Sequence, residues 1–166
     1  MKNIVLIGMP GAGKSTIGVV LAKRIGLNFV DSDLVIQEKE GKLLSQIIAE
    51  VGNEGFIEVE NRVNATLDCK DCVIATGGSV VYGKEAMKNL KEIGTVVYLK
   101  LGYEELTKRL GNLKDRGVVL KENQTLKDLY DERTKLYDEY ADIAFECDKK
   151  SIEQIVIELT DLITDR

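Results

Sequence analysis

The segment from residue 3 to residue 26 constrains the fold of this chain more than any other. Gly8–Ser15 reads Gly-Met-Pro-Gly-Ala-Gly-Lys-Ser, which matches the phosphate-binding pattern G-x-x-x-x-G-K-[ST]. The short apolar run Asn3–Ile7 precedes the pattern, and apolar residues recur at helical spacing after it until Gly26. A buried strand, a glycine-rich loop and a helix in this order favour a P-loop over a strand-to-helix turn that carries an exposed lysine.

The residue types in the loop match the chemistry of phosphate binding. Glycines keep side chains away from a polyphosphate that successive backbone N–H groups must reach, and the following helix directs its positive N-terminal end at the anion. Lys14 is placed to reach the β- and γ-phosphates, and the Ser15 hydroxyl to ligate Mg²⁺. We therefore expect a nucleoside triphosphate and Mg²⁺, bound by Gly11, Ala12, Gly13, Lys14, Ser15 and Thr16.

Composition excludes several classes of function. A chain of 166 residues predicts one domain with one core, and a net charge of −5 argues against a nucleic-acid surface. No apolar run approaches the roughly 20 residues that span a bilayer, so we expect no membrane association and a cytoplasmic location. The chain has no histidine, so acid–base work must use Asp, Glu, Lys or Tyr. We expect a monomer whose partners are a nucleoside triphosphate and a small-molecule acceptor.

The cysteines do not predict a metal or redox site. Cys69 and Cys72 form a Cys-x-x-Cys pair, and Cys147 is distant in sequence. No histidine can complete a zinc site, and the pair lies where a helix is expected to run into a strand, unlike a thioredoxin motif. We interpret all three as ordinary reduced thiols.

The periodicity of the chain predicts a three-layer α/β domain. Short apolar strands are predicted at residues 3–7, 28–30, 72–75, 95–99 and 143–147. Helical patterns separate the strands at residues 34–62, 86–90, 103–110, 126–140 and 152–162. The first of these patterns is broken at Gly41 and Gly52, and a new helix is predicted from about 54 toward 67. Such alternation predicts a parallel sheet with helices on both faces. Between Gly111 and Gln124 periodicity fades and charge rises, which predicts a mobile loop.

Two classes of P-loop protein compete for this sequence. A guanine-nucleotide switch usually carries N/T-K-x-D and D-x-x-G, and neither string occurs. A small-molecule kinase must exclude water with a lid that carries cations, and Arg109, Arg116 and Arg133 are spaced across the predicted loop and its borders. Asp31 and Asp33 follow the second predicted strand, where sheets of this kind place their ligands. This pattern favours the kinase.

The chain resembles shikimate kinases over essentially its full length. The resemblance is carried by the P-loop, Asp31-Ser-Asp33, the spacing Asp33-x-x-Ile36-x-x-x-x-Gly41, Gly77-Gly78 after a strand, Arg109 and Arg116 seven apart, and Arg133-x-x-x-Tyr137-x-x-x-Ala141. It implies a nucleoside-monophosphate-kinase type of fold with a five-stranded parallel sheet and a lid. Residues 1–166 would form a single P-loop kinase domain, with an acceptor-binding segment at about 32–62 and the lid at about 111–124.

The implied activity is ATP-dependent phosphorylation of a small hydroxylated metabolite, with shikimate as the leading candidate. Two alternatives stay open: a relative that phosphorylates another polyol, hydroxy acid or nucleotide, and a weakly active nucleotide-binding paralogue. On the nucleotide side, the resemblance implies that Asp31 helps to hold Mg²⁺, Arg109 lies against adenine and Arg116 stabilises charge on the transferring phosphoryl group.

On the acceptor side, the resemblance implies that Asp33 binds the acceptor hydroxyl and takes its proton, and that Arg133 grips the substrate carboxylate. Gly77 and Gly78 would contact the substrate through their loop. The implied catalytic residues are Lys14, Asp33 and Arg116.

Three departures from the family pattern bear on the acceptor pocket or the lid. The family helix reads Phe-Arg-x-x-Glu, and this chain has Phe56-Ile57-Glu58-Val59-Glu60, so Ile57 stands at the substrate position of an arginine. Ser79 replaces the third glycine of the family loop, and Arg116-Gly117 replaces Arg-Pro.

Two further charged residues of this helix, Arg62 and Glu60, need interaction partners. Arg62 lies about 140° round the helix from position 57, and we expect it to pair on the surface with Glu58 at i,i+4. Glu60 has lost its arginine partner. Either it favours an acceptor with an amine or an extra hydroxyl, or it turns to Arg133 or solvent and shikimate is accepted through Arg133 alone.

Overall fold

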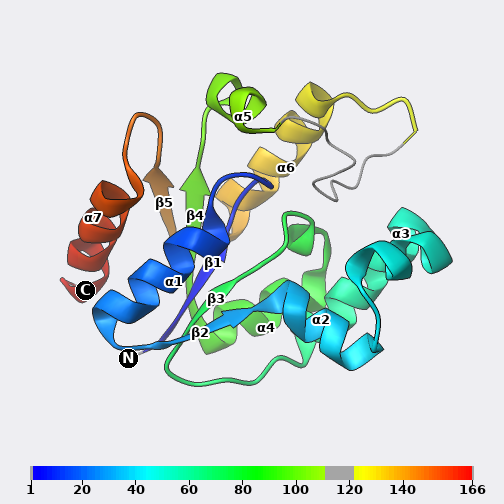
Figure 1. Ribbon diagram of the computed structural model, residues 1–166, viewed down its shortest axis with the longest axis horizontal. Helices are drawn as coiled ribbons and strands as arrows, with labels where there is room; N and C mark the ends of the chain where they lie inside the picture. Colours follow the sequence, from blue (N-terminus) through cyan, green and yellow to red (C-terminus); the bar gives the residue numbers. More distant parts are fainter. Residues whose placement is uncertain (1, 111–121, 166) are drawn as a thin grey trace.

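A five-stranded parallel sheet lies between two layers of helices in the computed structural model, which describes residues 2–110 and 122–165 (Figure 1). The spatial order is β2-β3-β1-β4-β5. The strands are β1 (Asn3–Ile7), β2 (Asn28–Asp31), β3 (Cys72–Ala75), β4 (Gly94–Lys100) and β5 (Ile143–Glu146). All four neighbouring pairs are parallel. The predicted α/β fold with a five-stranded parallel sheet is confirmed.

The helices cover both faces of the sheet. They are α1 (Lys14–Ile25), α2 (Ser32–Glu40), α3 (Leu44–Ala65), α4 (Lys84–Ile93), α5 (Tyr103–Arg109), α6 (Leu126–Tyr140) and α7 (Ile152–Thr164), with a 3₁₀ turn η1 at Val80–Tyr82. Helices α1 and α7 pack together on one face, and α4 and α6 lie on the other (Figure 1). The connections that leave β1 and β3 therefore run over opposite faces, which opens a crevice beyond the carboxyl ends of these strands.

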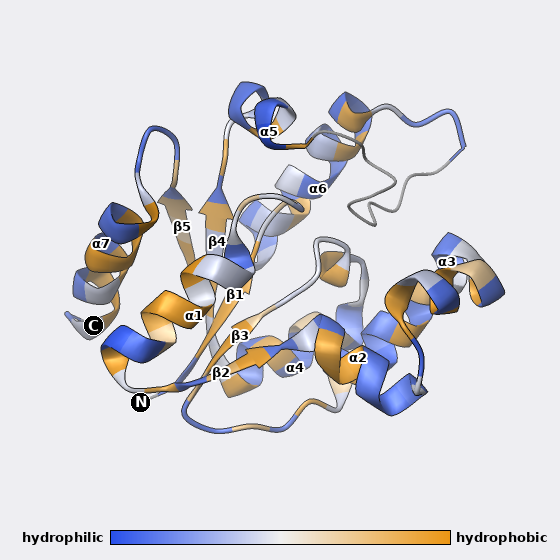
Figure 2. Cartoon of the chain, viewed as in Figure 1, coloured by the Kyte–Doolittle hydropathy of each residue, from blue (hydrophilic) through white to orange (hydrophobic). Residues whose placement is uncertain are grey.

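The central strands explain why the sequence reads as continuous apolar runs. Every residue of β1 and β3 is buried, because helices cover the sheet on both sides (Figure 2). Asn3 is the one polar residue of β1, and both ends of its side-chain amide form hydrogen bonds. Its Nδ2 donates to the Cys69 carbonyl at 2.8 Å, and its Oδ1 accepts from the Cys72 N–H at 2.9 Å. Asn3 thereby ties the loop between α3 and β3, which carries Cys69, to Cys72 at the start of β3. Both cysteines are free thiols.

Helix α2 begins two residues earlier than its apolar periodicity predicts. Asp31 ends β2 and also caps α2, because its Oδ1 accepts from the Asp33 N–H at 2.9 Å and from the Leu34 N–H at 3.4 Å. The predicted break at Gly52 is confirmed, since this residue interrupts α3 with φ of 74° and ψ of 179°. No helix in the described part of the chain is long and apolar enough to cross a membrane.

The prediction for Arg62 is wrong. Its Nη2 lies 2.9 Å from Glu40 Oε1 instead of pairing with Glu58. Helix α2 packs against α3, and this brings the C-terminal end of α2 within reach of Arg62. Spacing along one helix cannot reveal a partner that a second helix supplies.

Candidate active site

A cavity of about 470 Å³ is lined by the P-loop at one end and by segments from α2, α3, the loop after β3 and α6 at the other. Its lining residues are Pro10, Gly11, Gly13, Lys14, Ser15, Thr16, Asp33, Leu44, Ser45, Ile48, Phe56, Glu60, Thr76, Gly77, Gly78, Ser79 and Arg133. Residues that the sequence assigns to nucleotide and to acceptor thus share one cavity.

The P-loop has the geometry of an anion cradle. Gly11 and Gly13 adopt φ of 84° and 90°, a left-handed conformation that side chains disfavour, so N–H groups can turn into the loop. Lys14 is buried beneath the cradle, and its Nζ donates to the Gly8 carbonyl at 2.7 Å and the Met9 carbonyl at 2.9 Å. Burial lowers the pKa of Lys14 to about 8, and the Asp33 carboxylate opposes that shift. The loop therefore offers amide dipoles and an ammonium group to a polyphosphate, and it fits ATP.

Two oxygen donors lie together at the mouth of the P-loop. The Ser15 hydroxyl donates to Asp31 Oδ2 at 3.3 Å. A hydroxyl and a carboxylate fit Mg²⁺, which takes few protein ligands and completes its shell with water and phosphate oxygens. Residues 2–110 and 122–165 contain no group of three or more His, Cys, Asp or Glu side chains that could hold a metal ion.

Charged side chains approach the backbone of Gly77 and Gly78 closely at the other end of the cavity. A Cβ atom on Gly77 would lie 2.6 Å from Glu60 Oε2 and 3.0 Å from Asp33 Oδ1. A Cβ atom on Gly78 would lie 2.7 Å from Pro10 Cδ and 3.0 Å from Arg133 Nη1. A side chain at Gly77 would therefore displace the two carboxylates, and one at Gly78 would collide with Pro10 of the P-loop.

Asp33 and Glu60, the two carboxylates among the described residues that line the cavity, both have a raised pKa. Burial raises the pKa of Asp33, the nearby Asp31 carboxylate raises it further, and Lys14 opposes the rise. Burial also raises the pKa of Glu60 to about 7, against the opposing effect of its hydrogen bond with Ser79. Glu60 Oε1 accepts from Ser79 Oγ at 2.5 Å, and the equally buried Oε2 has no hydrogen-bond partner.

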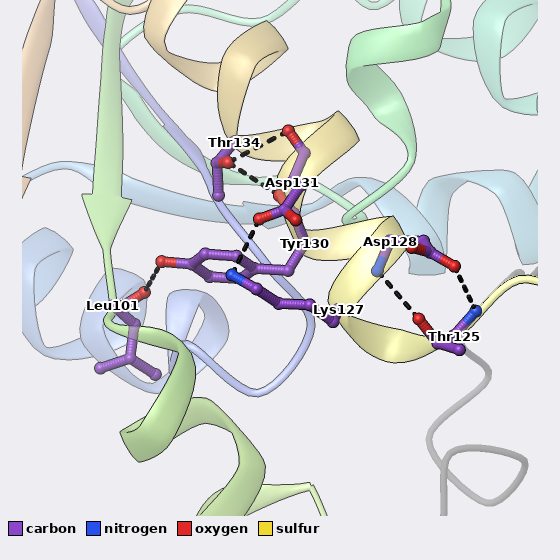
Figure 3. A network of polar contacts seen from close by, with 7 residues as sticks. All are labelled: Leu101, Thr125, Lys127, Asp128, Tyr130, Asp131 and Thr134. Atoms are coloured by element: carbon purple, nitrogen blue, oxygen red, sulfur yellow. Dashed lines mark hydrogen bonds and ion pairs between the residues drawn. The ribbon is translucent and has the colours of Figure 1, made fainter.

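Helix α6 is anchored by polar contacts at its N-terminal end (Figure 3), and its second turn carries Arg133, which lines the cavity. It begins with a reciprocal cap, in which the Asp128 N–H donates to Thr125 Oγ1 and the Thr125 N–H donates to Asp128 Oδ2, both at 3.1 Å. The Tyr130 hydroxyl donates to the Leu101 carbonyl at 2.9 Å, which ties the helix to the end of β4 (Figure 3). One turn further along, the tethered helix carries Arg133.

Arg133 is almost fully buried, with an exposed fraction of 1%. Its Nε donates to the Tyr82 hydroxyl at 3.4 Å, and its guanidinium carbon lies 5.4 Å from the centre of the Tyr82 ring. The Tyr137 hydroxyl donates to the Gly78 carbonyl at 2.6 Å, so α6 also holds the glycine loop. A buried guanidinium beside an open cavity is suited to bind a carboxylate through two parallel hydrogen bonds.

Comparison with known proteins identifies the family. The family model described as shikimate kinase matches residues 10–164. The chain belongs to the shikimate kinase family. It is 38% identical over 160 residues to the shikimate kinase of Persephonella marina, which covers 96% of this chain and 97% of the relative. It is 42% identical over 158 residues to the shikimate kinase of Legionella pneumophila (strain Corby), which covers 93% of this chain and 90% of the relative.

Solved structures agree with this assignment. The shikimate kinase of Acinetobacter baumannii in complex with shikimate is 34% identical, with a TM-score of 0.89, and the match covers 99% of this chain and 94% of that one. The shikimate kinase of Aquifex aeolicus is 29% identical, with a TM-score of 0.74. As a member of the shikimate kinase family, the chain is an ATP-dependent kinase that works with Mg²⁺.

The predicted site residues of this shikimate kinase family member mostly converge on the cavity. Those that line it are Gly11, Gly13, Lys14, Ser15, Thr16, Asp33, Gly77, Gly78 and Arg133. Ala12 is buried within the P-loop, and Asp31 reaches the site through Ser15. Arg116 and residues 111–121 of the predicted lid lie outside the described residues, so the lid and the role of Arg116 stay predictions.

Two predicted residues do not line the cavity. Ile57 is half-buried and packs against an apolar cluster of α2 and α3, formed by Ile36, Ile47, Phe56 and Val63. Arg109 lies at the end of α5, with its Nε 3.3 Å from Glu105 Oε1. The bond between Glu60 and Ser79 was not predicted, because the partners are 19 positions apart and no short-range pattern links them.

The raised pKa of Glu60 predicts how the free energy of unfolding depends on pH. Between its ordinary pKa of 4.5 and its folded pKa of about 7, the folded state keeps a proton that the unfolded state has released. The free energy of unfolding should therefore fall as pH rises through this window, by at most about 3 kcal/mol. Glu60→Gln should remove that loss, so the variant should match wild type near pH 4.5 and exceed it at pH 8, as measured by urea denaturation.

A matched control separates this effect from any change of charge on α3. Glu58 is exposed on the same helix, and Glu58→Gln should leave the pH slope unchanged. Asp33, Arg133 and Lys14 also face Glu60 and are kept in both variants. Identical pH slopes for wild type and Glu60→Gln would contradict the buried, proton-binding state of Glu60.

Proposed function

We propose that the chain transfers the γ-phosphoryl group of ATP to a hydroxyl of shikimate. The observation that carries the proposal is the single cavity in which a P-loop cradle meets Asp33 and buried Arg133. Support also comes from the fold of the Acinetobacter baumannii shikimate kinase, whose structure contains shikimate. In this cavity the phosphate cradle matches the phosphates of the donor, the carboxylate matches the hydroxyl of the acceptor, and the guanidinium matches the carboxylate of the acceptor.

On the nucleotide side, we assign the loop amides and Lys14 to the β- and γ-phosphates. Mg²⁺, held by Ser15 and Asp31, supplies positive charge at the phosphate oxygens when it is bound. Arg109 lies against adenine in this proposal, and Arg116 of the predicted lid stabilises charge on the transferring group. Closure of residues 111–124 would exclude water, since water would otherwise compete with the acceptor for the phosphoryl group.

On the acceptor side, we assign the reacting hydroxyl to Asp33 and the substrate carboxylate to Arg133. Asp33 accepts the hydroxyl proton as the new O–P bond forms, and the Gly77-Gly78 backbone allows the substrate to approach these groups. Burial raises the pKa of Asp33, and a base with a higher pKa holds the accepted proton better.

The direct test measures ADP release from ATP with shikimate and with a panel of polyols, hydroxy acids and nucleoside monophosphates. We expect shikimate to support turnover with phosphate recovered on a ring hydroxyl. Preference for another member of the panel would reassign the acceptor. Nucleotide binding without turnover on any member would favour a weakly active paralogue.

Ile57 gives a prediction about acceptor affinity. An arginine at this position would add a charge-assisted contact to the substrate carboxylate, worth roughly 1.5–3 kcal/mol. Its longer side chain would extend beyond the apolar cluster that holds Ile57. We therefore expect Ile57→Arg to lower the shikimate KM at least tenfold in steady-state assays, and Ile57→Leu to leave it within about twofold. An unchanged KM in Ile57→Arg would mean that position 57 faces away from the acceptor.

We further propose that residues 1–166 act as one kinase domain, monomeric and cytoplasmic, without nucleic acid or a membrane. Residues 32–62 would form the acceptor-binding segment and residues 111–124 the lid. Support comes from a site whose nucleotide and acceptor ends both come from one chain, and from a net charge of −5. Light scattering should give a mass near 18.4 kDa with and without ATP and shikimate. A doubled mass would contradict the monomer.

A further inference from the structure

Among the described residues that line the cavity, Glu60 is the one acidic side chain that the proposed transfer does not use. Its exposed fraction is 1%, and it lies on α3, where it accepts a hydrogen bond from Ser79 and interacts electrostatically with Arg133. An unpaired buried carboxylate oxygen is costly, so Oε2 calls for a partner that the described residues do not supply.

The position of Oε2 indicates what that partner is. Oε2 and Asp33 Oδ1 approach the same point above Gly77, at 2.6 and 3.0 Å from where a Cβ atom would lie. Both Asp33 and Glu60 line the cavity. Two carboxylate oxygens that lie this close to the same point can receive hydrogen bonds from neighbouring donors on one small molecule.

Ser79 determines which oxygen of Glu60 is left open. Its hydroxyl donates to Oε1 at 2.5 Å, and its own exposed fraction is 5%. Ser79 lies at the start of η1, so its position is fixed by the turn that follows the glycine loop. A carboxylate held at one oxygen by a fixed hydroxyl cannot rotate freely, so its other oxygen keeps its position beside Gly77.

We propose that Ser79 is a positioning residue that holds Glu60 so that Oε2 accepts a hydrogen bond from a non-reacting hydroxyl of the acceptor. The inference rests on the proposed function and deepens it, because it gives the site a preference for acceptors with a donor beside the reacting hydroxyl. Glu60 and Ser79 thus act on acceptor specificity, while Asp33 acts on the reacting hydroxyl and Arg133 on the acceptor carboxylate.

The first test separates acceptor binding from chemistry. Ser79→Ala and Ser79→Gly both remove the hydroxyl but change the side-chain volume by different amounts. Each variant should raise the shikimate KM about tenfold. In each, kcat and the ATP KM should stay within about twofold of the wild-type values. Ser79→Thr restores a hydroxyl and should recover most of the affinity. Asn89→Ala removes hydrogen bonds to the carbonyls of Asn64 and Leu67 outside the cavity, so it controls for a general loss of stability and should leave the shikimate KM unchanged.

The pH dependence of the shikimate KM distinguishes a positioning role of Ser79 from a merely structural one, because loss of a structural contact would not shift it. The Ser79 hydroxyl favours the ionised form of Glu60, so its removal should shift the pH dependence of the shikimate KM to higher pH. Glu60→Gln should remove that component. Asp33, Lys14 and Arg133 face the same group and are present in every variant, so differences between the profiles report on Glu60.

Substrate analogues identify the hydroxyl. Shikimate lacking one non-reacting hydroxyl at a time is compared on wild type, Ser79→Ala and Glu60→Gln. One analogue should lack the hydroxyl that Glu60 binds. For this analogue, the loss of affinity on Glu60→Gln should be no larger than the loss caused by Glu60→Gln alone or by removal of the hydroxyl alone, since both changes remove the same hydrogen bond. Additive losses for every analogue, or an unchanged shikimate KM in Ser79→Ala, would overturn the role of Ser79 and Glu60 and leave the proposed function intact.

Failure of the proposed function has a different signature. Wild type would then release no ADP with shikimate, and the same variants are compared with the panel member that does support turnover. An unchanged KM for that acceptor in Ser79→Ala would overturn the inference as well, and a tenfold rise would support it with a different substrate.

Discussion

Lys14→Ala is expected to reduce kcat about 10²–10³-fold, which corresponds to about 3–4 kcal/mol of lost transition-state stabilisation. The ammonium group lies beneath the phosphate cradle, where its two carbonyl contacts at 2.7 and 2.9 Å direct it toward the loop. Negative charge shifts among the phosphate oxygens during transfer, and a preorganised cation in a buried site stabilises that change more than it stabilises the bound ground state. Single-turnover measurement of phosphoryl transfer tests the expectation.

Lys23→Ala is the matched control for this prediction. Lys23 is exposed on the same helix, away from the cavity, so its removal should leave turnover unchanged. Circular dichroism and the denaturation midpoint show whether each variant is folded. Near-normal turnover in folded Lys14→Ala would refute the assignment of the P-loop to the transferring phosphate.

Asp33→Asn is expected to lower kcat about 10²-fold or more, because the amide keeps the shape of the side chain but cannot accept the hydroxyl proton. The backbone contribution of this residue survives the change, since its N–H still donates to Asp31 Oδ1 at 2.9 Å. Steady-state assays at saturating ATP and Mg²⁺ separate kcat from the acceptor KM.

Asp31→Asn distinguishes proton transfer from metal binding at this strand end. Asp31 lies beside the Ser15 hydroxyl, so its amide variant should raise the Mg²⁺ concentration needed for half-maximal activity. Asp33→Asn should leave that concentration unchanged. A loss in Asp33→Asn confined to the acceptor KM would show that Asp33 only positions the substrate.

The sequence by itself determined the nucleotide half of the site, because that half is local. Strand, loop and helix follow one another in a single segment, and the glycines, Lys14 and Ser15 take their places from backbone geometry within a few residues. The same holds for Asp31 and Asp33, which follow directly from the end of β2. Strands β1, β3 and β4 were also predictable, since a strand covered on both faces is a largely continuous apolar run.

Only the tertiary structure decided the acceptor half, because its contacts join residues that lie far apart in the chain. Ser79 reaches Glu60 across 19 positions, and Arg62 finds Glu40 across 22. Ile57 packs against an apolar cluster between two helices, a contact that its place in the motif does not reveal. Burial also comes from packing, and it is burial that raises the pKa of Glu60 to about 7. A sequence pattern specifies which groups are available, and the packing of α2, α3, α6 and the glycine loop specifies which of them meet.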